Sequence, residues 1–411
     1  MTIDTQYMDN VASTKEMLMT PAPRYQKPLN VAIYKDAIIL PYHHVDTLNG
    51  MGGGIITKDN QHISVLDIGE SRYNVNTSDI FEANKSVIYI GLLNHKWGHC
   101  ITDNIKKLWY LFTPEYQTAK DKMDIVYTYN EGDPIKGNFK EMLSMLGVAL
   151  DRCYAIIQPT IFKEVIVPDD SMIYGGKEYE LQNCQTCRYW TTPFKNLFDR
   201  IPRISSNKKW DKVYVSRRKW DGADFGEKDI ERLFKYVGFQ VIYPETMSFT
   251  EQLAVYQNCK CLASTEGSIS HNSLFMKDGA ELIIIRKADL LNTYQLMIND
   301  MKNLHCTYID CHLSIFNDKK YPYVGPFFLY VNNNLQRWAW TRMKEKCFLN
   351  TFRYENFCRY AQSAYVGDMD NRCEGDMFYY QRLKHEILNE HRHKYYKFAN
   401  KLFPRMFPWR D

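Results

Sequence analysis

The chain has 411 residues, of which 45% are hydrophobic and 24% are charged, and its formal net charge is +4. This composition is ordinary for a soluble globular protein of two or three domains, and the small net charge excludes a protein that binds nucleic acid over its whole surface. Aromatic residues make up 14% of the chain, a high fraction that weakly favours sugars or other amphipathic ligands.

Residues 1–27 are expected to form a loose N-terminal arm. Pro21 and Pro23 interrupt this region, Pro28 follows it, and it lacks the apolar core of a secretory signal. No stretch of the sequence approaches the ~20 apolar residues that a membrane-spanning helix needs. We therefore expect a cytoplasmic protein.

The pattern of metal-ligating residue types does not predict a bound metal. The eleven cysteines include one CxxC motif, at 184–187, and only the closely spaced residues at 259–261 or 305–306 could supply a second pair of zinc ligands. Neither pair has the spacing of a zinc site, so reduced thiols are expected. Asp368 and Asp370 have the spacing of a metal-binding acidic pair but lie in a polar loop outside the strand and helix pattern.

Residues 28–199 are expected to form a first α/β domain, because strand-like and helical segments alternate there. Ile101, Ile105, Leu108 and Phe112 share one face at helical spacing and predict a helix over 97–112. A further helix is predicted at 139–147, and strands are predicted at 31–40, 54–57, 62–68, 86–93, 124–129, 153–158 and 164–168.

Residues 200–318 are expected to form a second, Rossmann-like domain with a doubly wound parallel sheet, because strands and helices alternate regularly. Ser248 and Glu251 make a capping box at the start of one of its helices. Strands are predicted at 212–217, 239–244, 259–264, 281–286 and 306–310.

Residues 319–411 change to aromatic and charged helical sequence, which predicts a helical C-terminal region packed on the two domains or bridging them. From Gln381 onward, the chain has eight lysines and arginines and three acidic residues, so this part carries a net charge of +5. The basic aromatic tail at 393–411 fits either a helix that covers the domains or a peripheral contact with an anionic membrane surface.

Four polar residues crowd the carboxyl end of the strand predicted at 212–217: Ser216, Arg217, Arg218 and Lys219. Ligands of open parallel sheets bind at this end of the strands. Adjacent cations repel one another unless an anion lies among them, and arginine forks match phosphate oxygens. A phosphate site is therefore predicted, with a solvated basic turn as the alternative.

A second polar group follows a later strand of the same sheet. It comprises Glu266, Gly267, Ser268, His271 and Asn272. The pattern predicts a helix that starts near Ser268, whose free N–H groups would bind a diphosphate, while Gly267 allows a close approach to the backbone. Glu266 is placed to accept hydrogen bonds from sugar hydroxyls. Simple capping and packing are the alternatives for these residues.

His99 and Asp103 lie four residues apart in the helix predicted at 97–112 and share one face. His99 would stay neutral at the start of the helix and could accept a proton, while Asp103 would orient its ring. The alternative is a solvated polar face that also includes Lys106.

Together, the segments at 97–109 ("WGHCITDNIKKLW"), 214–220 ("YVSRRKW") and 238–276 resemble glycosyltransferase family 61, and the resemblance covers about residues 85–315. Members similar to this chain include bacterial capsular polysaccharide biosynthesis proteins. The resemblance implies an inverting, GT-B-like enzyme with two Rossmann-like domains facing a cleft, a nucleotide-sugar donor and no bound metal or other cofactor. This chain reads EGSISHN at 266–272, where eukaryotic members usually read HGAGLTN.

By position, the resemblance assigns to the donor side Arg217, Arg218, Glu266, Gly267, His271 and Asn272, and it places His99 and Asp103 at the cleft. The expected reaction is a single displacement in which His99, aided by Asp103, removes the proton of a glycan or lipid-linked glycan hydroxyl. Glu266 is the rival base. One alternative is a non-catalytic protein that binds nucleotide sugars or glycans. An epimerase is disfavoured because no GxGxxG motif follows a strand.

Overall fold

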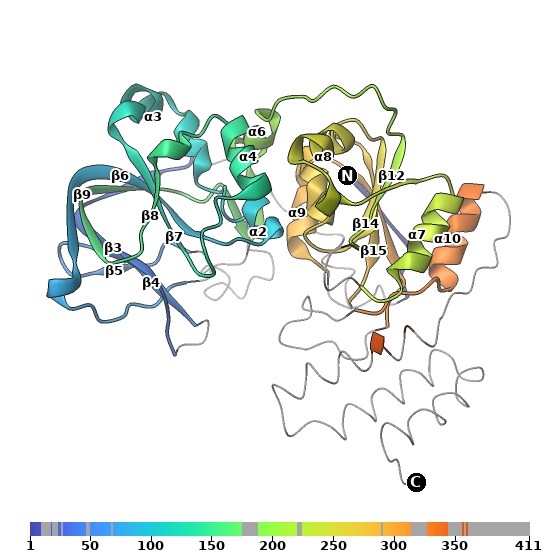
Figure 1. Cartoon of the computed structure of the whole chain (residues 1–411), viewed down its shortest axis with the longest axis horizontal. Coiled ribbons are helices and arrows are strands. Elements are labelled where there is room, and N and C mark those ends of the chain that lie inside the picture. The colour runs from blue at the N-terminus through green and yellow to red at the C-terminus, as the bar shows by residue number, and fades with distance from the viewer. Residues whose placement is uncertain are drawn as a thin grey trace, which may run out of the picture.

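The computed structural model describes residues 1–9, 18, 24–25, 28–46, 50–66, 69–174, 188–219, 224–288, 291–313, 327–343, 356 and 359–360. These residues form two α/β units that lie side by side (Figure 1). The first unit holds the sheet of residues 31–168, and the second unit holds the sheet of residues 2–7 and 212–310. The predicted mixed α/β fold with parallel strand pairing is confirmed.

The main sheet of the first unit has seven strands of mixed direction. Their order is β5 (His62–Ile63), β4 (Met51–Ile56), β3 (Val31–His44), β9 (Thr160–Pro168), β6 (Phe81–Leu93), β7 (Asp124–Tyr129) and β8 (Cys153–Ala155). The run from β9 to β8 is parallel, whereas β3, β4 and β5 pair in antiparallel fashion. A small separate sheet consists of β10 (Met172–Tyr174), β11 (Arg188–Thr191) and β2 (Arg24–Tyr25).

Short helices connect the strands of the first unit, and those at 97–101, 137–145 and 192–199 lie on the side that faces the second unit (Figure 1). The α-helices are α2 (Trp97–Ile101), α3 (Pro114–Ala119), α4 (Gly137–Met145) and α6 (Thr192–Asp199). The 3-10 helices are η1 (Thr77–Asp79), η2 (Leu108–Phe112), η3 (Lys120–Lys122) and η4 (Leu150–Arg152).

The sheet of the second unit has six strands, all parallel. Their order is β1 (Thr2–Tyr7), β16 (His305–Asp310), β15 (Glu281–Arg286), β14 (Cys261–Thr265), β12 (Lys212–Val215) and β13 (Gln240–Ile242). Leu282 and Ile284 of β15 pack into one apolar cluster, and Ile283 and Ile285 pack into another. The continuous run of apolar residues therefore marks a strand that is covered on both faces.

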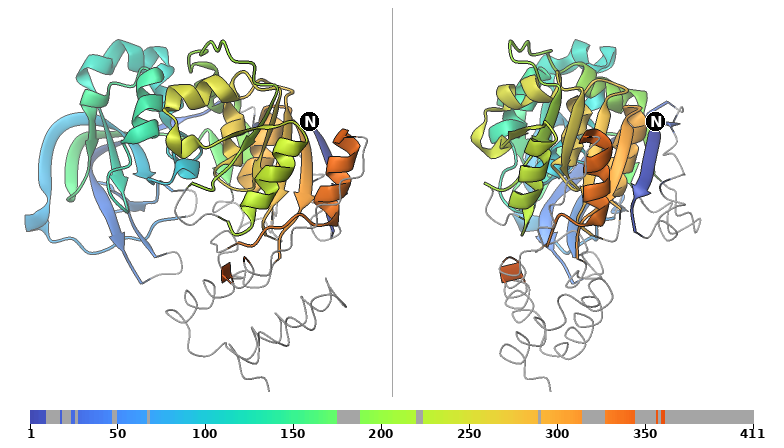
Figure 2. Two further views of the ribbon diagram at one scale, coloured as in Figure 1. Left: turned by 45° about the vertical axis from the view of Figure 1, so that its right-hand side comes forward. Right: turned by 90° about the vertical axis from the view of Figure 1, so that its right-hand side faces the viewer.

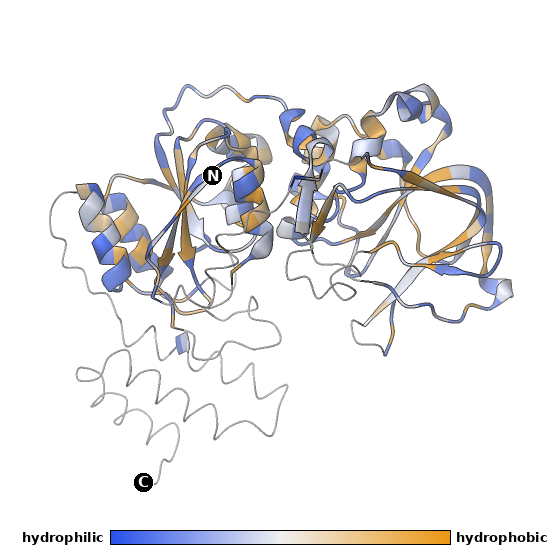
Figure 3. Ribbon diagram, turned by 180° about the vertical axis from the view of Figure 1, so that it is seen from behind, coloured by the Kyte–Doolittle hydropathy of each residue, from blue (hydrophilic) through white to orange (hydrophobic). Residues whose placement is uncertain are grey.

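Helices cover both faces of this sheet (Figure 2). On the outer face lie α7 (Glu227–Tyr236) and α10 (Asn333–Met343). On the face toward the first unit lie η5 (Pro244–Thr246), α8 (Phe249–Tyr256), η6 (Ser270–Phe275) and α9 (Thr293–Met301). Ile125 and Tyr127 of the first unit share one apolar cluster with Phe275 and Ile284 of the second, so a single core joins the two units. Figure 3 shows that the strands at the centre of the second sheet are largely hydrophobic.

The prediction of a loose arm over 1–27 is wrong at its start, because Thr2–Tyr7 forms the edge strand β1 of the second sheet. The strand pairs in parallel with β16, and Tyr7 packs into the outer apolar cluster. The partner strand lies about 300 residues away in sequence, since Thr2 pairs with His305. A local pattern with few apolar residues does not reveal such a pairing.

The continuous helix predicted over 97–112 is also wrong, because α2 ends at Ile101 and η2 begins only at Leu108. Two side chains bind backbone groups at this break. Asn104 accepts from the Asn94 N–H at 2.9 Å and donates to the Asn94 carbonyl at 2.8 Å, and the Thr102 hydroxyl donates to the Gly98 carbonyl at 2.9 Å. Such bonds compete with regular helical pairing.

Of the predicted helical region at 319–411, the described part includes α10, which packs against β16 and β1 of the second unit. The tail at 393–411, the acidic pair Asp368 and Asp370, and the CxxC motif at 184–187 lie outside the described residues. Within the described ranges, no helix is both long enough and apolar enough to cross a bilayer. The domain boundaries at 27, 199 and 318 stay predictions.

Gly226 gives the first testable prediction. It precedes α7 at φ +89°, and a Cβ atom there would lie 1.9 Å from the Leu329 carbonyl oxygen, whereas Gly238 at φ +88° has nothing within 4 Å. We expect Gly238→Ala to lower the free energy of unfolding by about 1 kcal/mol through its backbone conformation alone. Gly226→Ala should lower the free energy of unfolding by about 3 kcal/mol or more, because the backbone of the 327–330 segment must move. Urea unfolding measures both, and equal losses would contradict the close packing at Gly226.

Candidate active site

The order of the strands in the second sheet reverses between β12 and β14. From β12 the chain passes to β13 on one side and then to β14 on the other. In open parallel sheets, ligands bind at such a point, just beyond the carboxyl ends of the strands. The loops after β12 and β14 are also the two segments that the sequence predicts to bind a phosphate group.

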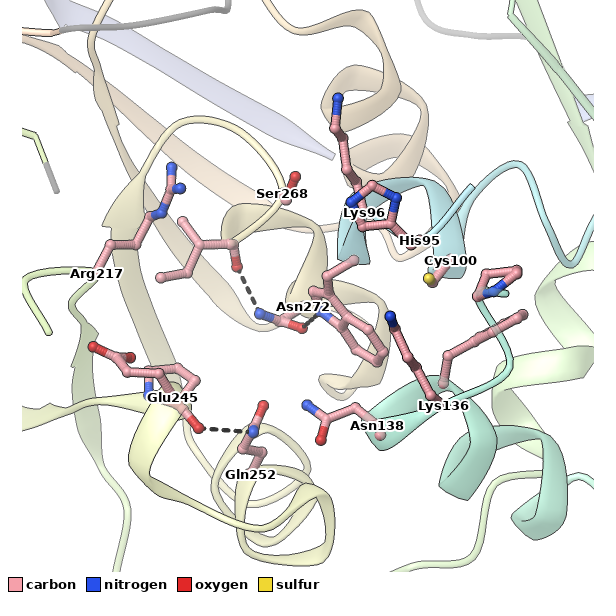
Figure 4. Close-up of a pocket in the computed structure, with 16 residues that line it drawn as sticks. His95, Lys96, Cys100, Lys136, Asn138, Arg217, Glu245, Gln252, Ser268 and Asn272 are labelled. Carbon is pink, nitrogen blue, oxygen red and sulfur yellow. Dashed lines mark hydrogen bonds between the residues drawn. The ribbon is translucent and has the colours of Figure 1, made fainter. Parts of the chain in front are cut away.

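A cavity of about 740 Å³ lies at this position, between the two units (Figure 4). Arg217 and Ser268 line it from the second unit, and Lys96, Trp97 and Lys136 line it from the first. Its volume falls within the ~300–1,000 Å³ of typical small-molecule sites. The cavity therefore has the size and place of a ligand site to which both units contribute.

The junction between α2 and η6 forms the inner wall of the cavity. Trp97 donates its indole N–H to Asn272 Oδ1 at 2.8 Å and packs edge-on against Phe249, with ring centroids 5.5 Å apart. A Cβ atom on Gly98 would lie 2.5 Å from the Ser268 hydroxyl oxygen. The absence of a side chain at Gly98 therefore lets α2 of the first unit lie directly on the loop that follows β14.

Two buried glutamates of α7 hold the turn after β12. Glu227 Oε1 accepts the Arg217 N–H and the Tyr214 hydroxyl, both at 3.0 Å. One turn later, Glu231 Oε1 accepts the Ser216 hydroxyl at 2.6 Å and Arg218 Nε at 3.0 Å. The position of this basic turn is thus set by carboxylates that lie beneath it.

The predicted donor-binding residues after β12 have different surroundings. Arg217 lines the cavity. Arg218 binds Glu231 and lies 3.2 Å from the Tyr243 hydroxyl, and Lys219 stacks 4.5 Å from the centre of the Tyr243 ring. The lining of the cavity includes neither Arg218 nor Lys219 nor Ser216, and their roles toward a donor stay predictions.

Glu266 follows β14 and is buried, with 1% of its surface exposed. Its Oε1 accepts the Asn292 N–H at 2.7 Å, at the N-cap of α9, and its Oε2 has no partner among the described residues. Burial raises the pKa of Glu266, while the charge of Arg286 acts against this rise. These contacts fit a carboxyl that fixes the loop before α9, and its predicted role as rival base stays untested.

The helix predicted to start near Ser268 is a six-residue 3-10 helix, η6, which begins at Ser270. Its first turn is closed locally, because the N–H and hydroxyl of Ser270 donate to the Gly267 carbonyl at 2.9 and 2.7 Å. A short 3-10 helix concentrates less positive potential at its start than a long α-helix does. The predicted α-helix is therefore wrong, whereas a diphosphate site in the loop before η6 stays a prediction.

His271 and Asn272 hold η6 in place. His271 is buried and donates Nδ1–H to Gln295 Oε1 at 2.9 Å, and burial lowers the pKa of His271 to about 4. The ring is therefore neutral at physiological pH. Asn272 donates to the Ile269 carbonyl at 3.0 Å and accepts from Trp97, so it lines the cavity and joins the two units.

The predicted contact between His99 and Asp103 is present. His99 Nδ1 donates to Asp103 Oδ2 at 2.6 Å, the Tyr294 hydroxyl donates to Oδ1 at 2.7 Å, and Lys106 Nζ lies 3.1 Å from Oδ1. Burial raises the pKa of Asp103, but the charge of Lys106 and the bond from His99 outweigh it and keep this pKa below its ordinary value. The ionised carboxylate fixes Nδ1–H and leaves Nε2 able to accept a proton.

His99 does not line the cavity described above, although Trp97 and Cys100 on the same helix do. The imidazole is 47% exposed and lies on another side of α2. A different imidazole, His95, lines the cavity and has its Nδ1 3.5 Å from Glu131 Oε2. Two pairs of histidine and carboxylate therefore lie at and just before α2, but His99 and both carboxylates are outside the cavity lining.

The sequence analysis did not identify several residues of the site. Glu231 could have been found from its i, i+4 spacing to Glu227, which places both carboxylates on one helix face. Tyr294, which comes from α9 of the other unit, has no local signal in the segment around Asp103. His95 and Lys136 belong to separate loops of the first unit, which only the tertiary fold brings to one cavity.

Residues 97–283 match the family model described as Glycosyltransferase 61. The matched segment starts at α2 and ends in β15, so it spans both walls of the cavity. This match supports the assignment of this part of the chain to the glycosyltransferases of family 61. No curated protein matches the sequence.

Among solved structures, two similar chains are of the dodecameric iron-containing protein TibC. The heptosyltransferase in complex with ADP-D-beta-D-heptose has 9% identity and a TM-score of 0.26, with 66% of this chain and 81% of that chain covered. The glycosyltransferase from enterotoxigenic E. coli H10407 has 8% identity and a TM-score of 0.25, with 69% and 88% covered. These TM-scores are too low to support a fold or a function for this chain.

Glu227 gives a prediction about stability and pH. Burial and the charge of Asp224 raise the pKa of Glu227 from 4.5 to about 7. Between these pH values the folded state keeps a proton that the unfolded state has released, so the free energy of unfolding falls as pH rises and levels off above about 7. Glu227→Gln keeps an acceptor oxygen for Arg217 but cannot ionise, so we expect a smaller fall in this variant. Urea unfolding at a series of pH values between 4.5 and about 7 measures this fall in the wild type and the variant. A fall of equal size in both proteins would contradict the prediction.

Proposed function

We propose that this chain is an inverting glycosyltransferase of GT-B-like architecture. It would move a sugar from a nucleotide-sugar donor to a hydroxyl of a glycan or glycolipid acceptor, in the biosynthesis of a bacterial surface polysaccharide of the capsular kind. The main support is the cavity between two α/β units at the point where the strand order reverses, with Arg217 in its wall. The match of residues 97–283 to glycosyltransferase 61 supports the same class of reaction.

On the donor side, the diphosphate would lie beyond β12 and β14. Arg217 provides the cation there, and Glu227 fixes the backbone of this residue. Gly267, at φ +119°, and Ser268 allow the ligand to approach the backbone after β14. Positive charge at this place stabilises the negative charge that develops on the leaving diphosphate.

On the acceptor side, the hydroxyl oxygen would attack the anomeric carbon of the donor from the face opposite the diphosphate. The new carbon–oxygen bond forms as the bond to the diphosphate breaks, so the configuration inverts. The proton of the hydroxyl passes to His99 Nε2, and the nucleoside diphosphate leaves with the electron pair of the broken bond. Asp103 stabilises the imidazolium that forms, because it accepts the Nδ1–H at 2.6 Å. The proposed chemistry assigns no step to a metal ion.

The position of His95 favours a second candidate for the base. His95 lines the cavity, whereas His99 does not, and it has Glu131 as a carboxylate neighbour. Three observations nevertheless favour His99. Its distance to Asp103, 2.6 Å, is shorter than the 3.5 Å between His95 and Glu131. Tyr294 and Lys106 also hold the Asp103 carboxylate, and the imidazole is exposed to an incoming acceptor. Glu266 is less suited, because it is buried and bound to the Asn292 N–H.

The expected location is the cytoplasm, with peripheral contact at the inner face of the membrane through the basic aromatic tail. Such a contact would bring the cavity near a lipid-linked acceptor. The tail lies outside the described residues, so this part of the proposal depends on its sequence alone.

A panel of UDP-, GDP-, CDP- and ADP-sugars tests the class of function. We expect at least one of these donors to raise the melting temperature and to be hydrolysed slowly in the absence of acceptor. Stabilisation without hydrolysis or transfer would instead favour a non-catalytic nucleotide-sugar or glycan binding protein. No stabilisation by any of them would contradict the donor assignment.

His99→Ala tests the base. We expect the variant to fold and to lose about 10²–10⁴-fold in the rate of transfer, because the proton then lacks an acceptor. His95→Ala is the matched comparison, since it removes an imidazole four residues away on the cavity side. Steady-state kinetics with the donor selected from the panel measure both. Full turnover by His99→Ala together with a large loss in His95→Ala would transfer the role to His95.

A further inference from the structure

Most cations of the second unit near the carboxyl edge of the sheet already have a carboxylate partner. Arg218 pairs with Glu231 at 3.0 Å, Arg286 pairs with Asp310 at 2.7 Å, and Lys287 Nζ lies 3.6 Å from Asp224. A paired cation adds little net positive potential for a further anion. The charge available for a diphosphate is therefore smaller than the number of basic residues at this edge indicates.

Arg217 differs from these cations because its guanidinium has no carboxylate partner within the described ranges, and it lines the cavity. One such cation does not balance the diphosphate of a nucleotide sugar, which is a dianion. Further positive charge must come from another wall of the same cavity if the diphosphate is bound there.

The first unit provides two such charges. Lys96 and Lys136 line the cavity, and neither side chain has an ion pair or hydrogen bond with another described residue. Glu245 is the single carboxylate residue of the lining, so the three cations and Glu245 leave a net +2 around the cavity. Figure 4 shows Lys96, Lys136 and Arg217 around this space, on elements of both units.

The place of Lys136 in its helix supports a binding role. Lys136 occupies the N-cap of the nine-residue helix α4 and makes no capping hydrogen bond. Asp, Asn, Ser and Thr are the residues that stabilise an N-cap, and a cation there is unfavourable beside the positive end of the helix. A lysine with this local cost and no protein partner fits a residue whose charge is matched by a ligand.

We propose that Lys96 and Lys136 of the first unit bind the diphosphate of the donor together with Arg217 of the second unit. This inference rests on the proposed function and adds to it that both units hold the donor, rather than the second unit alone. The charge around the cavity, net +2, then equals that of the dianion in magnitude. The leaving diphosphate is stabilised from both sides as its bond to the sugar breaks.

Calorimetric binding of nucleoside diphosphates to the full chain tests the proposal. The probes are UDP, GDP, CDP and ADP, and the tightest of the four is then measured with Lys96→Ala, Lys136→Ala and the control Lys140→Ala. Lys140 is an exposed lysine of the same helix α4 and is not in the cavity lining. We expect each cavity variant to weaken binding about tenfold and Lys140→Ala to leave it unchanged.

Two further measurements distinguish a phosphate contact from a structural effect. Binding of the matching uncharged nucleoside should not change in Lys136→Ala, and Lys136→Arg should restore most of the affinity for the diphosphate. Circular dichroism checks that each variant folds.

The outcomes separate this inference from the proposed function. If the wild type binds a diphosphate and both cavity variants bind it equally well, the inference is overturned and the proposed function stands. If these variants instead raise only the KM for an anionic acceptor, the two lysines belong to the acceptor site and the inference is likewise wrong. If the wild type binds none of the four diphosphates, the proposed function itself fails.

Discussion

The contact between α2 and η6 is the constraint on which the rest of the structure depends. Gly98 lets the backbone of one unit lie against Ser268 of the other, and Trp97 fills the space beside it with an indole bonded to Asn272. Because the apolar core continues across this contact, the two sheets keep a fixed relation to each other. The cavity at the switch point exists because this contact sets the distance between its two walls.

Buried carboxylates determine which basic side chains at this edge stay available. Glu231 forms an ion pair with Arg218, and Asp310 forms one with Arg286, so these positive charges are neutralised within the protein. Glu227 accepts the backbone N–H of Arg217 but does not bind its guanidinium, which lines the cavity. Counting basic residues in the sequence therefore overstates the charge that a ligand meets, and the wall supplied by the first unit gains importance.

The sequence predicts well where the physics is local. The alternation of strands and helices over 200–318 predicted a parallel sheet that includes β15, and the spacing of His99 and Asp103 predicted their contact, which persists although the helix around them breaks. The break itself was not predictable from apolar spacing, because it depends on the hydrogen bonds that Asn104 makes to Asn94. The pattern that predicted a helix from Ser268 likewise could not show that the turn closes as a 3-10 helix. Pairings between distant segments, such as Thr2 with His305, leave no local signal.

The central claim is that the cavity between the two units binds the diphosphate of an activated sugar. The most direct measurement is a crystal structure of the full chain with a bound nucleoside diphosphate. We predict phosphate oxygens within hydrogen-bonding distance of the Arg217 guanidinium, between β12, the loop after β14 and α2. A diphosphate bound at another place in the chain, with this cavity filled only by solvent, would contradict the account.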